Sequence, residues 1–116
     1  MKTELEGRTK RFAVQIVKTV SCFPKTADGQ IIGRQLLKSG TSIGANYREA
    51  NRAQSRLDFI HKIGIAEKEA AETIYWLEIC QETKLGNKEA IDTLHKEAGE
   101  LLAILITIGR KTKNSK

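Results

Sequence analysis

Apolar residues recur at helical spacing along almost the whole chain, and they divide it into four stretches. The first stretch, residues 4–22, carries them at Leu5, Phe12, Ile16, Val17 and Val20, and Phe23-Pro24 ends it. The second, residues 28–53, follows a capping Thr26 or Asp28 and carries them at Ile32, Leu36, Ile43, Tyr47 and Ala50. Each pattern places its apolar side chains on one face of an amphipathic helix.

The third and fourth stretches begin at local capping signals. Ser55-Arg56-Leu57-Asp58 resembles a capping box, in which the serine hydroxyl accepts from a first-turn amide. The apolar positions that follow are Ile60, Ile63, Ala70, Ile74 and Leu77, interrupted by Glu67. Gly86 suits the left-handed position after a helix, and Asn87 then caps the next one. The fourth helix has an uninterrupted heptad stripe at Ile91, Leu94, Ala98, Leu101, Leu105 and Ile108.

Four such helices joined by short loops predict an all-α protein, an antiparallel up-down-up-down four-helix bundle. We expect residues 1–113 to form this single domain and residues 114–116 to form a basic tail. The chain has 116 residues, 40% of them hydrophobic, which is enough for one core without disulfides. The single proline, Pro24, agrees with long helices.

Two apolar features exceed what one bundle needs. Ile65, Trp76 and Ile79 fall on the side of the third helix opposite its core stripe, where an isolated bundle would leave them exposed. Residues 101–108 are apolar on nearly all sides of the fourth helix. We therefore expect a homo-oligomer whose interface uses Ile65, Trp76, Ile79, Leu102 and Ile106. The alternative is a thick core with a few harmless exposed apolar residues.

Small residues occupy the middle of the second helix, in the stretch SGTSIGA. Glycine costs about 1 kcal/mol relative to alanine inside a helix, so Gly40 and Gly44 need a structural reason. We expect a neighbouring helix to approach them closely. A phosphate-binding loop is excluded, because its glycines lie in a turn before a helix.

The formal net charge of +6 is unevenly spread along the chain. Residues 1–23, 24–55 and 84–116 each have a net charge of +3, whereas residues 56–83 have −3. Such a chain can bind nucleic acid with its basic segments, pair its acidic segment with a basic one of another copy, or simply have a solvated charged surface. No signal peptide or membrane span is apparent, and two cysteines form no disulfide framework, so we expect a soluble, cytoplasmic protein.

Candidate catalytic and metal sites are weak. Two Asp-x-x-His pairs, Asp58 with His61 and Asp92 with His95, lie about 24–33 Å apart along the predicted bundle and cannot share a metal. Cys22, Cys80 and His95 fall near one end, but without the spacing of zinc ligands. No nucleophile stands on a strained turn. We therefore expect no catalytic residues, no metal and no cofactor.

Glu67 interrupts the apolar stripe of the third helix. A buried carboxylate needs a partner, and Asn46, Tyr47 or Arg48 on the second helix could provide one. The alternative is that Glu67 lies at the edge of the stripe and reaches water. The first reading predicts a structural network that links the two helices through Asn46, Glu49 and Glu67.

The stretch SGTSIGANYREANRAQSRLDFIHKIGIAEKEAAETIYWLE, residues 39–78, resembles the bacterial large-subunit rRNA intervening-sequence proteins. The similarity continues upstream through Leu36-Leu37 and Phe23-Pro24-Lys25, so it covers most of the chain. Many relatives have Ser-Ile-Pro-Ala-Asn where this sequence has Gly44 in place of the proline. With Gly44 at this position and Arg48-Glu49-Ala50 after Tyr47, the sequence resembles a bacterial subgroup of the same family.

The resemblance implies a left-handed bundle that assembles as a homopentamer in relatives. A related accessory protein of diversity-generating retroelements is a basic pentamer that partners a reverse transcriptase and nucleic acid. No catalytic residues are established for the family. The motif positions of structural or interface interest are Asn46, Glu49, Arg52, Phe59, Glu67 and Trp76.

The sequence therefore predicts a non-enzymatic oligomeric scaffold that binds RNA, DNA or a nucleic-acid-processing protein, and no membrane. Its candidate contacts are the cations Arg8, Lys10, Arg11, Lys18, Arg34, Lys38, Arg48, Arg52, Arg110, Lys111 and Lys113, with Lys116 in the tail. Aromatic residues make up only 5% of the chain, so binding should depend on the phosphate backbone and on salt. The alternative is a protein-only interaction or assembly module.

Overall fold

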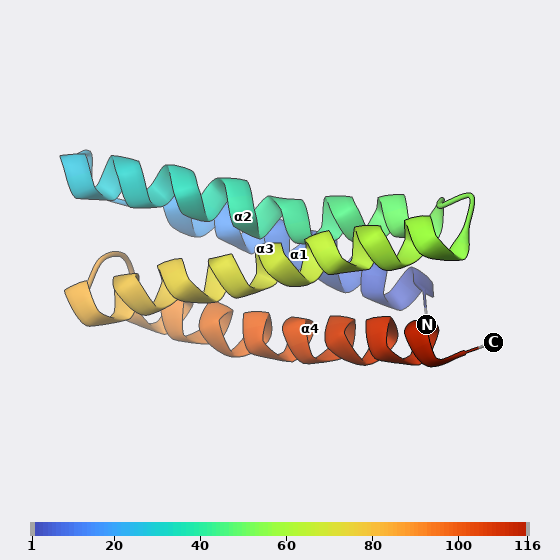
Figure 1. Ribbon diagram of the computed structural model, residues 1–116. Coiled ribbons are helices and arrows are strands. Elements are labelled where there is room, and N and C mark those ends of the chain that lie inside the picture. Colours follow the sequence, from blue (N-terminus) through green and yellow to red (C-terminus); the bar gives the residue numbers. More distant parts are fainter. Residues whose placement is uncertain (1, 116) are drawn as a thin grey trace.

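Four antiparallel helices form the molecule, and each successive helix runs back along the one before it (Figure 1). The computed structural model describes residues 2–115. The helices are α1 (Lys2–Ser21), α2 (Ala27–Asn51), α3 (Arg56–Thr83) and α4 (Lys88–Asn114). The bundle measures 50 × 21 × 19 Å. The predicted all-α four-helix architecture is confirmed, and its left-handed sense stays a prediction.

Three of the helices begin where the sequence predicts, because a short polar side chain accepts from a first-turn amide. Thr26 accepts from the Gly29 amide at 3.2 Å, Ser55 from the Asp58 amide at 3.0 Å, and Asn87 from the Ala90 amide at 2.9 Å. The alternative cap for α2, Asp28, lies inside the first turn instead.

The end of α3 differs from the prediction in one respect. The residue that caps it in the left-handed conformation is Lys84, with φ 58°, and Gly86 adds a second positive φ of 82° in the following turn. Gly86 also allows a close approach of Phe23, since a Cβ at this position would lie 2.6 Å from Phe23 Cε1. The tight α3–α4 turn is therefore packed against the α1–α2 turn.

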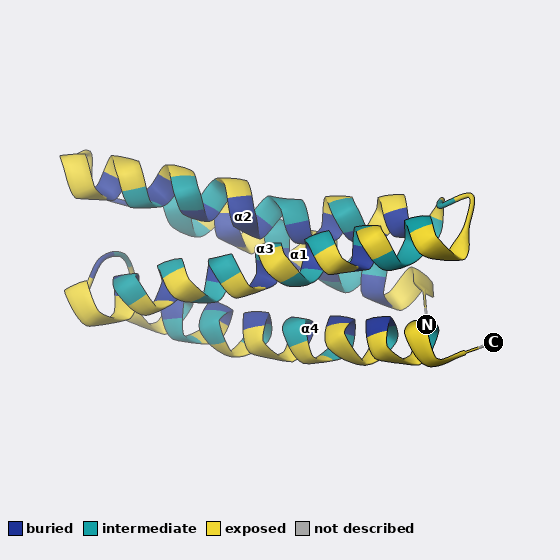
Figure 2. Ribbon diagram, in the orientation of Figure 1, coloured by how far each residue is buried: buried dark blue, intermediate teal, exposed yellow. Residues whose placement is uncertain are grey.

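The core is formed by the inward faces of all four helices (Figure 2). Its largest fully buried side chains include Ile16, Leu36, Ile43, Ile63, Leu77, Ile91, Leu101 and Leu105. Several predicted core positions are only half-buried, namely Val20, Ile32, Ile60, Ile74 and Ile108, and Val17 is 48% exposed. Within residues 2–115, no helix is long and apolar enough to cross a membrane.

The glycines of α2 have the predicted role. A Cβ on Gly40 would lie 2.9 Å from Ile16 Cγ1, and one on Gly44 would lie 2.9 Å from Thr9 Oγ1. Contacts this short force atoms to shift, so α1 and α2 approach more closely than side chains at these positions allow. A Cβ on Gly109 of α4 would lie 2.8 Å from Glu67 Oε2 and 3.3 Å from Ile63 Cγ2, so this glycine leaves room for the flexible Glu67 side chain of α3.

The prediction that one bundle leaves Ile65, Trp76 and Ile79 exposed is wrong, because all three are half-buried. The reason is the position of α3, which packs extensively against both α2 and α4. By contrast, α1 and α4 share the smallest interface of the four adjacent helix pairs.

Candidate nucleic-acid interface

Most of the cations predicted to contact nucleic acid lie on the surface. Ten are exposed: Lys10, Arg11, Lys18, Arg34, Lys38, Arg48, Arg52, Arg110, Lys111 and Lys113. Lys116 lies outside the described residues. Nine of the ten come from α1, α2 and α4, and Arg52 caps the end of α2.

Arg8 differs from the other candidates because it is already engaged inside the protein. Its Nε and Nη2 donate to the two carboxylate oxygens of Glu97 at 2.7 and 2.8 Å, and Nη2 donates to Glu100 at 2.7 Å. The hydrogen bonds that Arg8 donates to Glu97 are the main reason why the pKa of Arg8 lies above its ordinary value. Arg8 therefore joins α1 to α4 across their small interface, and its charge is compensated there.

The antiparallel topology sorts the remaining charges by position along the bundle. We define the terminal end as residues 2–8, 48–62 and 105–115, where α1 and α3 begin and α2 and α4 end (Figure 1). It holds nine basic side chains against four acidic ones. The basic ones are Lys2, Arg8, Arg48, Arg52, Arg56, Lys62, Arg110, Lys111 and Lys113, and the acidic ones are Glu4, Glu6, Glu49 and Asp58.

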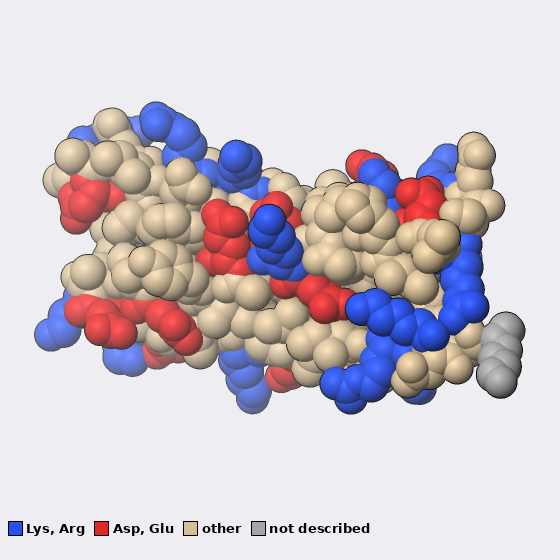
Figure 3. Space-filling view, in the orientation of Figure 1, with Lys and Arg blue, Asp and Glu red and all other residues tan. Residues whose placement is uncertain are grey.

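The rest of the bundle is electrically balanced. The turn end, residues 15–34 and 77–95, holds five basic and five acidic side chains. The middle, residues 9–14, 35–47, 63–76 and 96–104, again holds five of each. Arg8 of the terminal end is paired with Glu97 and Glu100, which are counted in the middle, so most, but not all, of the net positive charge of the described chain lies at the terminal end, where Figure 3 shows Lys and Arg gathered at the right.

Local pairing at the terminal end uses only part of this charge. Lys62 donates to Glu49 at 2.9 Å, which raises the pKa of Lys62, and Asn51 donates to Glu6 at 2.9 Å. An open hollow of about 660 Å³ lies at the α2–α3 turn between Glu49, Arg52 and neighbouring polar residues. Arg48, Arg52, Arg110, Lys111 and Lys113 have exposed side chains around these pairs.

Arg56 is a basic residue that sequence reasoning did not select. Its Nε and Nη2 donate to the backbone oxygens of Thr112 and Lys113 at 3.0 and 2.9 Å. The last carbonyls of a helix have no amide partner four residues further on, so this contact helps to cap α4. The Thr112 carbonyl also accepts from the Ser115 amide at 3.3 Å and from the Ser115 hydroxyl at 3.1 Å. The Arg56 contact also holds the C-terminal turn of α4 beside the start of α3. The sequence pattern does not indicate this role, because Arg56 is one of the two middle residues of the capping box, which have no specific function in that motif.

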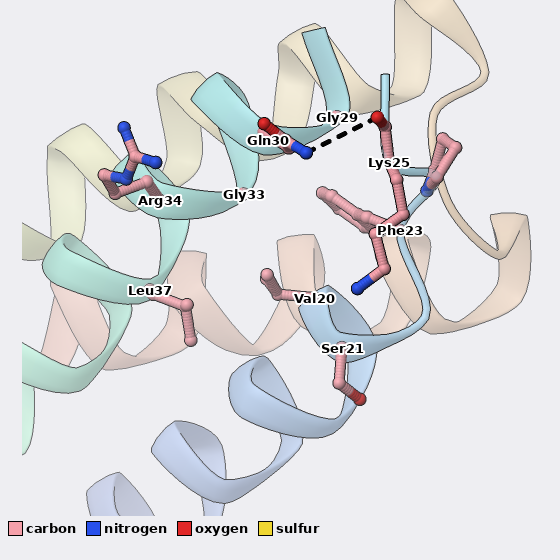
Figure 4. A pocket seen from close by; sticks show the side chains of 10 residues that line it. Val20, Ser21, Phe23, Lys25, Gly29, Gln30, Gly33, Arg34 and Leu37 are labelled. Atoms are coloured by element: carbon pink, nitrogen blue, oxygen red, sulfur yellow. Dashed lines mark hydrogen bonds between the residues drawn. The ribbon is translucent and has the colours of Figure 1, made fainter. Parts of the chain in front are cut away.

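The turn end has a smaller hollow of about 240 Å³, shown in Figure 4. Val20, Phe23 and Leu37 form its apolar part, and the Gln30 amide donates to the Lys25 carbonyl at 3.4 Å. The nearby N-terminus of α2 already holds the Asp28 carboxylate, whose pKa is lowered mainly by the Thr26 hydroxyl and then by backbone amides. This helix N-terminus is therefore satisfied by the protein itself.

The family described as 23S rRNA-intervening sequence protein matches residues 2–107. The chain belongs to this family. It is also similar to a solved crystal structure of a protein of unknown function from the S23 ribosomal protein family of Bacteroides thetaiotaomicron VPI-5482, at 40% sequence identity. The alignment covers 95% of this chain and 99% of the other, with a TM-score of 0.84. A search of curated proteins found no match.

In this member of the intervening-sequence family, the predicted network of Asn46, Glu49 and Glu67 is not formed within the described chain. Asn46 donates to the Ser42 carbonyl of its own helix at 2.8 Å, and Glu49 pairs with Lys62. Glu67 is half-buried, and its carboxylate lies against Gly109 of α4 rather than against α2. It lies at the edge of the stripe because α3 presents this side to α4.

The residues predicted for a contact between copies lie on α3 and α4. Ile65, Trp76, Ile79 and Leu102 are half-buried, and Ile106 is 36% exposed. The Trp76 indole donates to Glu72 at 3.2 Å, and its ring meets the Tyr75 ring edge to face at 5.0 Å. Tyr75 is itself 54% exposed, and the sequence reasoning had not selected it.

Two of the weak catalytic and metal candidates of this family member, Asp92 and His95, have internal partners. Asp92 accepts from Lys88 at 2.6 Å and from Gln81 at 2.9 Å, and the pKa of Asp92 is lowered, mainly by Lys88. His95 lies 3.3 Å from Glu78. Burial raises the pKa of the Cys80 thiol to about 11, and Cys22 is exposed. Among the described residues, no group of three or more His, Cys, Asp or Glu is placed to hold a metal.

Proposed function

We propose that this protein is a non-enzymatic, oligomeric scaffold that binds nucleic acid through exposed cations. The observation that carries the proposal is the charge distribution, in which the terminal end holds nine basic and four acidic side chains. Exposed cations that are not neutralised by neighbours attract phosphates and release counterions when they bind. Asp92 and His95, the residues of the second Asp-x-x-His pair, already have partners within the bundle, Lys88 and Glu78.

Self-association is the second part of the proposal. Tyr75 on α3 is 54% exposed and Ile106 on α4 is 36% exposed, and each helix carries a further half-buried apolar residue, Trp76 on α3 and Leu102 on α4. Apolar residues at the surface of two helices that pack against each other suit a contact with another copy. Five copies are the expectation from the resemblance to pentameric relatives.

Both parts are tested on the purified protein by light scattering, together with the ratio of absorbance at 260 to that at 280 nm before and after a high-salt wash. A defined oligomer that releases nucleic acid in salt supports the proposal. A protein that shows no affinity for added RNA or DNA at low salt contradicts the nucleic-acid part. A monomer contradicts the scaffold part.

A protein-only assembly module is the second candidate, and the exposed apolar residues of α3 and α4 favour it. Two variants separate the interface from a general effect of added charge. Ile106→Asp should disperse the oligomer, whereas Val17→Asp, at a 48% exposed position on α1, should leave it assembled. An oligomer that survives Ile106→Asp, with normal circular dichroism for both variants, means that this surface is not the interface.

A further inference from the structure

We infer that nucleic acid binds at the terminal end of the bundle, through its phosphate backbone, and that the turn end and the sides contribute little. This inference rests on the proposed function and locates its site. Six exposed cations form the surface: Lys2, Arg48, Arg52, Arg110, Lys111 and Lys113. They come from three helices that the topology brings together at one end (Figure 3).

The surface is assembled by tertiary structure rather than by a run of basic residues. Arg48 lies in the last turn of α2 and Arg52 caps its end, and the C-terminal cations lie in the last turns of α4. Arg56 connects the two regions, because its guanidinium binds the Thr112 and Lys113 carbonyls from the first turn of α3. The backbone that carries Lys111 and Lys113 is thereby held against the α3 start.

Cations at helix C-termini also have a structural explanation, since they complement the helix dipole. That explanation accounts for one or two cations in each last turn, and Arg56 already satisfies two carbonyls of α4. It does not explain why basic and acidic side chains are equal in number elsewhere, with five of each at the turn end and five of each in the middle. The excess at one end remains available for an anionic partner.

The chemistry of the surface favours backbone contacts over base recognition. Phe59 is the one aromatic residue of the terminal end and is half-buried, and Tyr47, just outside this end, is buried, so neither offers a free ring for stacking. Arginine and lysine side chains contact phosphates without selecting a sequence. If all six cations engaged phosphates of a duplex, log K would fall with log salt at a slope of about −5.

The test compares two variants that remove the same number and kind of cations from opposite ends. The first carries Arg52→Gln, Lys111→Gln and Lys113→Gln, and the control carries Arg34→Gln, Lys18→Gln and Lys25→Gln. All six positions are exposed, so both variants should fold, which circular dichroism checks. Binding of a fluorescent RNA duplex of about 20 base pairs is followed by anisotropy between about 50 and 200 mM salt.

We expect the terminal-end variant to bind about tenfold or more weakly at the lower salt, with a slope reduced in magnitude by two to three, or about 0.9 per lost contact. The control should stay within about twofold of wild type. The two ends are separated along a 50 Å axis, several times the Debye length of about 10 Å at 0.1 M salt. Charge removed at the turn end therefore has little effect at the terminal end.

Wild-type protein that fails to bind the duplex at the lowest salt contradicts the proposed function itself. Wild-type binding that both variants weaken equally leaves that function standing and overturns the location of the site. A control that binds more weakly than the terminal-end variant overturns it as well. Binding that depends strongly on RNA sequence would contradict the backbone mode.

Discussion

The close approach of α1 and α2 makes a sharp prediction at Gly44. Replacing this residue with alanine introduces a Cβ that lies 2.9 Å from Thr9 Oγ1 and 3.1 Å from Thr9 Cβ. Thr9 is fully buried, and its hydroxyl donates to the Leu5 carbonyl at 2.9 Å. Since both the side chain and the α1 backbone are fixed, the helices must move apart to accept the methyl group.

Two opposing effects determine how much Gly44→Ala changes the free energy of unfolding. Alanine gains about 1 kcal/mol over glycine in a helix interior, and overpacking in a rigid contact costs about 1–3 kcal/mol. Thr9 cannot rotate away without losing its hydrogen bond, so the upper part of that range applies. We expect Gly44→Ala to lower the free energy of unfolding by about 2 kcal/mol.

Gly99 provides the matched control. It lies in the interior of α4, and a Cβ there would meet nothing within 4 Å. Gly99→Ala should therefore raise the free energy of unfolding by about 1 kcal/mol, the opposite sign to Gly44→Ala. Urea unfolding followed by circular dichroism measures both, at two protein concentrations because association adds to apparent stability.

The reasoning fails if Gly44→Ala is as stable as wild type while Gly99→Ala is stabilised. That result would mean that α1 can shift by several tenths of an ångström at no cost, and that Gly44 is not required by the helix contact. A destabilised Gly99→Ala would separately contradict the open environment assigned to Gly99.

Three further predictions concern single side chains. Arg8→Gln removes the α1–α4 ion pairs and should lower the free energy of unfolding by about 1 kcal/mol at low salt, and by less at about 1 M salt, in urea titrations. Asn87→Ala removes the α4 cap and should cost about 1 kcal/mol in the same assay. Burial raises the pKa of Cys80 from 9.0 to about 11, so its stabilising contribution is complete below pH 9 and is lost as the pH rises towards 11. The difference in unfolding free energy between wild type and Cys80→Ala should change accordingly over that interval, and Cys22 should react with a thiol reagent well before Cys80 does.

Local sequence signals predicted the helices and their starts well, because those features depend on neighbouring residues. Thr26, Ser55 and Asn87 each cap a helix through an amide within three residues. The glycine pair of α2 was informative for a similar reason, since two glycines in a helix interior need compensation that only a packed neighbour provides. Exact burial was less predictable: Ile108 is half-buried, whereas Gly109 beside it is fully buried.

The side-chain contacts that join helices distant in sequence could not be predicted from the sequence pattern. Arg8 was predicted to be a surface contact, yet it binds two carboxylates about 90 residues away in the chain. Arg56 was not selected, yet it caps a helix more than 50 residues later. Both roles depend on which helix faces come together and on how long side chains cross the gap, and periodicity does not encode either.

The position of the positive charge illustrates a different limit. Counted by segment, three parts of the sequence each have a net charge of +3, which spreads the basic candidates over three helices. When the charged residues are counted by their position along the axis of the antiparallel bundle, the turn end and the middle each contain five basic and five acidic side chains, and the excess lies at the terminal end. The predicted topology already contained this information, but it becomes visible only when the helices are aligned side by side.

The basic end and the proposed assembly have a physical relation through symmetry. In a closed ring whose bundles run along its single rotation axis, the bundle of every copy points the same way. The terminal ends of all copies then lie on the same rim of the ring. A two-fold dimer with antiparallel bundles would instead place its terminal ends on opposite sides. A ring therefore concentrates the excess charge of each terminal end on one face, where several weak backbone contacts act together. The salt dependence of binding should then be steeper for the assembled protein than for a variant dispersed by Ile106→Asp, because more phosphates are neutralised per complex.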